Sequence, residues 1–167
     1  QPPPCPAPPP MPAAPQIPPS LLRPILVRGL ADALAAAAAA DSAGAALALM
    51  APPAGGAPWL LGLIGRVRRA HPGLGVTGLL DCGDRAGEAQ GALAAGVPAL
   101  LFTGGTAAAD RLAAIAAAHG AVLLTACPPL LDLAAEGHGS IRPALLEALC
   151  RDWLAQAKGW AESRAGG

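Results

Sequence analysis

The chain has 167 residues, of which 53% are hydrophobic and 13% charged, with 11 basic and 11 acidic side chains. This length fits one small domain with a tail. The zero net charge and the 2% of aromatic residues argue against a nucleic-acid partner, because the chain offers neither a basic face nor a base-stacking platform. Gly, Pro, Asp or Arg interrupts every apolar run before the roughly 20 residues that a membrane-spanning helix needs. We therefore expect no nucleic-acid partner and no membrane segment.

The four cysteines, at positions 5, 82, 127 and 150, form no Cys-x-x-Cys pair. Such scattered thiols are unlike a disulfide framework or a zinc ribbon, and they favour a reducing compartment. The first residues lack the basic stretch and apolar core of a secretory signal. We expect a cytoplasmic protein.

A proline-rich tail is predicted over residues 1–21, where eleven of the first twenty residues are proline. Proline has no backbone donor, so this segment is expected to be extended or disordered. Its Pro-x-x-Pro spacings also match ligands of polyproline-binding domains, although the flanking Arg that orients such ligands is missing. A flexible tail and a polyproline ligand are the two interpretations.

Short aliphatic runs then alternate with alanine-rich stretches through residues 22–142. Strands are predicted at residues 25–28, 46–50, 76–80, 99–102 and 122–125, and helices at 30–43, 58–70, 85–95 and 106–119. Each predicted helix is followed by a glycine suited to a left-handed turn: Gly44, Gly73, Gly96 and Gly120. Pro58 and Thr106 suit helix starts.

This alternation predicts an α/β fold with a five-stranded parallel βαβαβαβαβ sheet. Because the strands are apolar throughout, helices are expected on both faces. Half of a TIM barrel and an open doubly wound sheet both satisfy the pattern. Residues 143–167 are predicted to form a C-terminal amphipathic helix and tail, which covers the sheet or a subunit surface.

Candidate site residues follow the predicted third strand, in Asp81-Cys82-Gly83-Asp84. Sites in parallel α/β folds gather where the strands end, which makes Asp81 a candidate acid/base. The alternative for Asp81 is a structural carboxylate bonded to loop amides. Cys82 is a candidate metal ligand, or else a small buried apolar residue. Asp84 is expected to cap the next helix.

The predicted fourth strand ends in Thr103-Gly104-Gly105-Thr106. Two glycines before a helix let an anion approach the backbone, so Gly83, Gly104, Gly105 and Thr106 are candidates for binding a phosphorylated ligand. An ordinary tight turn uses the same residues. Cys127, after the fifth strand, is a second candidate metal ligand beside Cys82, and His138 is expected to be a surface loop residue.

Residues 29–132 resemble the first five βα units of class II, zinc-dependent fructose-bisphosphate aldolases. Leu80-Asp81-Cys82-Gly83 stands where that family has Leu-Asp-His-Gly, Ala95-Gly96 precedes the fourth strand, and Thr103-Gly104-Gly105 stands where the family has Asp-Gly-Ser. The resemblance implies about half of a barrel, with Asp81 in the place of the catalytic acid/base and Cys82 in that of a zinc-binding histidine. Residues 122–127 contain no counterpart of the family's fifth-strand glutamate.

Because of these departures we expect an aldolase-like half-barrel domain without catalysis, which binds a small ligand or a protein partner. The alternative is a lyase acting on a small phosphorylated metabolite, with Asp81 as acid/base and zinc on Cys82 and Cys127. Half a barrel leaves sheet edges open, so a homo-oligomer is also expected.

Overall fold

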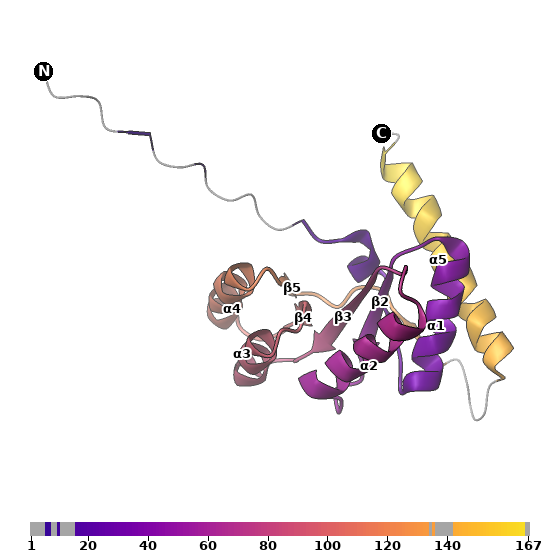
Figure 1. Cartoon of the computed structure of the whole chain (residues 1–167). Helices are drawn as coiled ribbons and strands as arrows, with labels where there is room; N and C mark the ends of the chain where they lie inside the picture. The colour runs from indigo at the N-terminus through magenta and orange to yellow at the C-terminus, as the bar shows by residue number, and fades with distance from the viewer. Residues whose placement is uncertain (1–5, 8–9, 11–15, 134, 136–141, 166–167) are drawn as a thin grey trace, which may run out of the picture.

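The computed structural model describes residues 6–7, 10, 16–133, 135 and 142–165, and these build an all-parallel sheet with α-helices around it (Figure 1). The strands are β1 (Ile25–Leu26), β2 (Leu47–Ala51), β3 (Val76–Asp81), β4 (Ala99–Leu101), β5 (Val122–Leu124) and β6 (Leu131–Asp132). The helices are the 3₁₀ turn η1 (Pro19–Leu22) and α1 (Leu30–Ala43), α2 (Ala57–Ala70), α3 (Ala86–Ala94), α4 (Thr106–Ala118) and α5 (Pro143–Ala165). Most of the expected proline-rich tail lies outside the described residues.

The α/β fold class is confirmed, with one more strand than predicted. The five predicted parallel strands and the C-terminal helix are present. The strand order is β5-β4-β3-β2-β1-β6, which is an open sheet with β5 and β6 at its edges. In the described part of the chain, no helix combines the length and the hydropathy that crossing a membrane requires.

The expectation of helices on both faces of the sheet is wrong. From β1 to β5 each new strand adds on the same side of the previous one. Right-handed crossovers then place every connecting helix on the same face. The buried residues of α1 to α4 accordingly belong to one cluster, the helix-side core, together with the β2 residues Leu47, Leu49 and Ala51. The strand order does not reverse between β1 and β5, but β6 then adds beside β1 instead of beside β5, so the sheet is open.

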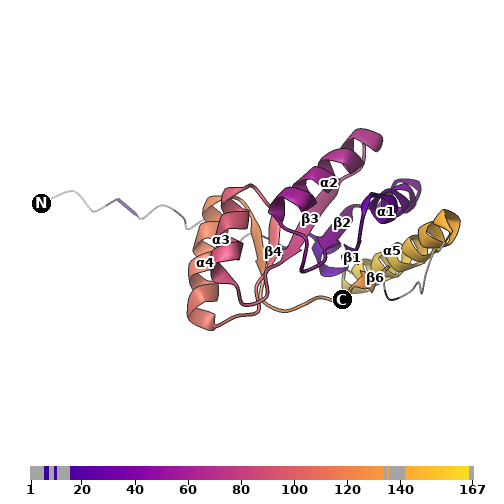
Figure 2. The same cartoon turned by 90° about the horizontal axis from the view of Figure 1, so that it is seen from below.

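The other face of the sheet, called here the far face, carries its own apolar cluster. Its buried residues are Leu21, Ala48, Met50, Leu79, Ala99, Leu101 and Leu124. None of these residues comes from an α-helix. Figure 2 shows the helices in an arc around the strands, while the segment after β5 crosses the open side toward β6.

This crossing segment explains the sixth strand. Because β6 is parallel to β1, the chain must return from the end of β5 to the beginning of β1, and it does so across the far face, where Leu130 packs. Ile25 and Leu26 pair with Leu131 and Asp132. A strand of two residues has no detectable period in the sequence, so it was not predicted.

The helix ends follow the glycine prediction at three of the four positions. Gly44, Gly96 and Gly120 have the expected positive φ, whereas Gly73 does not. The C-cap of α2 is His71 instead, and a turn closed by the Leu74 N–H donating to His71 O at 3.1 Å accommodates Pro72-Gly73. Because Gly73 has no positive φ, this turn contains no left-handed residue, as in a type I turn.

The α5 helix packs against α1 through small side chains. The inward face of α1 consists of buried alanines, which allow close approach of Leu146, Cys150 and Leu154 from α5. The Trp153 Nε1–H donates to Arg23 O at 3.1 Å, and the Arg23 guanidinium lies 3.8 Å from the centre of the Trp153 ring. These contacts tie α5 to the segment that leads into β1.

Candidate functional site

The predicted acid/base residue lies at the carboxyl edge of the sheet and is already hydrogen-bonded. Asp81 is the last residue of β3, and its Oδ1 accepts a hydrogen bond from the Gly83 N–H at 2.9 Å. Gly83 has φ +52, so the chain turns sharply directly after the strand. Asp81 therefore makes the bond to a loop amide that was expected of a structural carboxylate, the alternative to an acid/base role.

The expectation that Asp84 caps α3 is wrong. The N-cap of α3 is Arg85, and no side chain caps this helix. The left-handed turn at Gly83 delays the helix by one residue. The Arg85 guanidinium instead folds back over the loop, where its Nη1 lies 3.1 Å from the position of a Cβ on Gly83 and its Nη2 donates to Asp81 O at 3.5 Å.

The two candidate metal ligands have opposite surroundings. Cys82 is fully buried in the helix-side core, and its Sγ lies 3.9 Å from Leu80 O. Burial, with a smaller contribution from the Glu88 carboxylate, raises the pKa of the Cys82 thiol from 9.0 to about 11. Cys127 is exposed in the segment after β5, with its Sγ 3.5 Å from Pro128 O. A thiol that is sealed off and protonated at neutral pH is a poor metal ligand.

No metal centre is built by the described residues. Among them, no three His, Cys, Asp or Glu side chains come together in a group that could hold a metal ion. His138, expected at the surface, lies outside the described residues.

The loop before α4 is joined to the loop after β3. The Thr103 N–H donates to Gly83 O at 2.8 Å, so Gly83 and the residues 103–106 form one continuous surface. Gly104 lies on the buried Phe102 ring, and a Cβ at this position would overlap the ring. Packing therefore explains Gly104 without a ligand.

Gly105 and Thr106 have no such explanation. Gly105, rather than Thr106, is the N-cap of α4, and a Cβ at Gly105 would meet nothing within 4 Å. Gly105 and Thr106 are exposed, no side chain caps the helix, and its first turn contains no acidic residue. The first-turn amides lack an intrahelical acceptor and carry the positive end of the helix dipole.

The other three connecting helices start differently. The first turn of α1 contains Asp32, which accepts a hydrogen bond from the Arg28 N–H at 3.1 Å, and the first turn of α3 contains Glu88. Proline replaces one of the donors at the start of α2. Of the four, α4 alone combines a first turn without proline and a first turn without an acidic residue.

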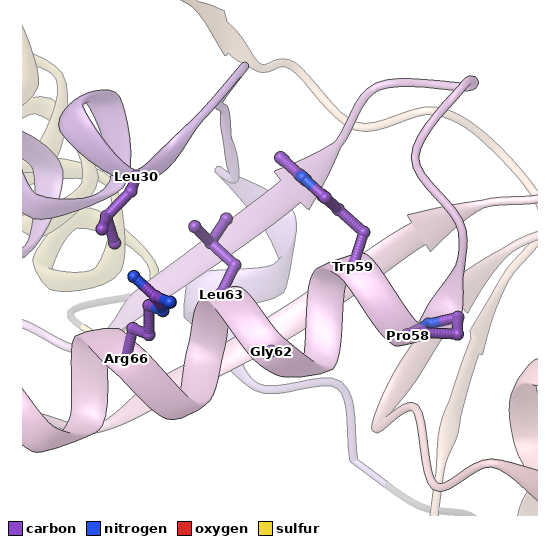
Figure 3. Close-up of a pocket in the computed structure, with 6 residues that line it drawn as sticks. All are labelled: Leu30, Pro58, Trp59, Gly62, Leu63 and Arg66. Atoms are coloured by element: carbon purple, nitrogen blue, oxygen red, sulfur yellow. The ribbon is translucent and has the colours of Figure 1, made fainter.

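A pocket of about 360 Å³ between α1 and α2 was not predicted. Figure 3 shows the residues that line it: Leu30, Pro58, Trp59, Gly62, Leu63 and Arg66. The signal in the sequence was the helical spacing of Trp59, Leu63 and Arg66, which places an aromatic ring and a cation on one face. Such a stripe is easily taken for core.

Comparison with known proteins gives no family assignment. No protein-family model matches the chain, and no curated protein matches it. The likeness to class II aldolases thus rests only on short motifs.

Proposed function

We propose that this chain is an aldolase-like half-barrel domain without catalysis, which binds a small phosphorylated ligand at the N-terminus of α4. The observation that carries the proposal is the open, uncapped and exposed start of α4 at Gly105 and Thr106, at the sheet edge where sites of parallel α/β folds lie.

The chemistry of this helix start fits a phosphate group. The N–H groups of Thr106, Ala107 and Ala108 point out of the first turn, and phosphate oxygens accept hydrogen bonds from such donors. The Thr106 hydroxyl adds a further donor. Arg85, half exposed on the loop joined to Thr103, adds positive charge to the same surface, although Glu88 is its partner.

The two residues that a lyase would need lie in different surroundings. The Asp81 carboxylate accepts a hydrogen bond from the Gly83 N–H, and Cys82 is buried with a raised thiol pKa. A zinc ligand needs a thiolate, which the burial of Cys82 disfavours, whereas the hydrogen bond to Oδ1 of Asp81 leaves the second carboxylate oxygen available. The environment of Cys82 therefore supports binding over a zinc-dependent lyase.

Titration with inorganic phosphate and with a triose phosphate tests the site, with backbone amide chemical shifts as the measurement. Shifts are expected at residues 105–108. The Ala107→Asp variant places a carboxylate in the first turn and should weaken binding about tenfold, because it repels the anion and takes its donors. Ala113→Asp is the matched control, since it adds the same charge to the same helix at another exposed position. Shifts that are absent, or equal in both variants, would refute the proposal.

Self-association is the second part of the proposal. β5 is an edge strand of apolar residues, Val122–Leu124, and Leu145 on α5 has 54% of its surface exposed. Unpaired apolar edges favour pairing with another chain. Size-exclusion chromatography with light scattering is the test, and a strict monomer at micromolar concentration would contradict this part.

A further inference from the structure

One face of α2 forms the floor of the pocket between α1 and α2. Trp59, Gly62, Leu63 and Arg66 succeed one another along α2, and Leu30 at the start of α1 forms the opposite wall (Figure 3). Gly62 presents no side chain, so a ligand can approach the helix backbone there. The pocket lies on the outer, helical surface and shares no residue with the start of α4.

Trp59 is a fixed and accessible aromatic wall. Trp59 has 37% of its surface exposed, although large aromatic residues are usually buried. The Cε3 atom of the ring lies 3.1 Å from the position of a Cβ on Gly55, so the preceding loop supports the ring from behind. A supported, exposed indole offers a flat surface for stacking at little entropic cost.

Arg66 supplies an uncompensated positive charge at the other end of the pocket. Among the described residues, Arg66 takes part in no ion pair or hydrogen bond. Arg68, on the same helix, instead donates to Val76 O at 2.9 Å. α2 contains three arginines and no acidic residue, so no carboxylate of its own neutralises Arg66.

We infer that this pocket binds a small carboxylate with a flat apolar body. The body lies against Trp59, Pro58 and the two leucines, and the carboxylate meets the Arg66 guanidinium, whose planar fork matches it. Arg66 lies seven positions after Trp59, which at the helical rise is about 10 Å, the length of a bicyclic aromatic acid. An apolar pocket of this size with one polar anchor is typical of small-molecule sites.

Calorimetric titration with 2-naphthoate and its neutral analogue 2-naphthamide tests the inference. The acid is expected to bind more tightly than the amide. The Arg66→Gln variant should weaken naphthoate binding about tenfold and leave naphthamide unchanged, because only the acid uses the charge. Trp59→Ala should weaken both compounds. Arg69→Gln is the matched control, since Arg69 is exposed on the same helix but does not line the pocket.

Two results would overturn the inference. The first is equal binding of acid and amide, unaffected by Arg66→Gln. The second is no naphthoate binding together with self-association that Trp59→Ala abolishes, which would assign the pocket to an interface between two copies. Arg66 is exposed, so its replacement leaves the fold intact, and circular dichroism checks this. The phosphate titration at α4 has its own variants, so either proposal can fail alone.

Discussion

Alkaline pH should weaken this fold through two buried thiols. The chain has no tyrosine and a single lysine, so few other groups lose a proton between pH 8 and pH 11. Burial raises the pKa of Cys82 to about 11 and that of Cys150 to about 12, in both cases from 9.0. An unfolded chain loses these protons first, so its free energy falls relative to that of the folded protein as the pH rises past 9.

The size of the effect follows from the shift. Each pKa unit corresponds to about 1.4 kcal/mol, so Cys82 alone should cost about 2 kcal/mol of the free energy of unfolding between pH 8 and pH 11. Cys150 should cost an amount of the same order, since its thiol pKa is raised further. Small domains are stable by only about 5–15 kcal/mol. The stability is fully present below pH 9 and is lost as the pH approaches 11.

Urea unfolding followed by circular dichroism from pH 7 to pH 11, in the presence of a reductant, measures this loss. The double variant Cys82→Ala/Cys150→Ala is expected to be less stable at pH 7, because it leaves two small cavities, but nearly independent of pH. Cys127→Ser is the control, because Cys127 is exposed, and it should keep the alkaline loss. If the double variant loses as much stability at pH 11 as the unsubstituted protein, the buried thiols are not the cause and the reasoning fails.

Four substitutions test the packing. Gly78→Ala drives a Cβ into an isoleucine of α2 and should destabilise the fold by about 1–3 kcal/mol in urea unfolding; no loss would contradict this contact. Gly104→Ala should cost a similar amount because it overlaps a buried ring, whereas Gly105→Ala meets open space and should change stability little; equal effects would contradict the geometry. Trp153→Phe removes the hydrogen bond to Arg23 O and should lower the free energy of unfolding by about 1 kcal/mol, which thermal unfolding detects as a lower midpoint; an unchanged midpoint would argue against that bond.

The sequence was informative where the structure is local. The helix predicted over residues 30–43 is α1, and the glycine turns were confirmed at Gly44, Gly96 and Gly120, because periodicity and left-handed φ are properties of a few neighbouring residues. The face on which the helices lie was not predictable in this way. It depends on the order in which the strands join the sheet, and no short segment encodes that order.

In the candidate site, too, the local features could be predicted from the sequence and the features that join distant segments could not. The sequence indicated that Asp81 follows a strand, and it is the last residue of β3. Whether its carboxylate turns to the Gly83 N–H or to a ligand depends on the dihedral angles of the turn. The pocket at Trp59 was missed because it needs Leu30 from a second helix, and pairing between helices is not visible in either segment alone.

The pairing of β1 with β6 has a consequence for synthesis on the ribosome. β1 leaves the ribosome first among the strands, but its outer edge stays unpaired until β6 has been made and has crossed the far face. During that interval the nascent chain presents an open backbone edge beside the uncovered leucines of the far face, and both favour aggregation. The outer edge of β1 is therefore completed only when residues 125–132 have been made, so this side of the sheet stays open for most of the synthesis of the chain.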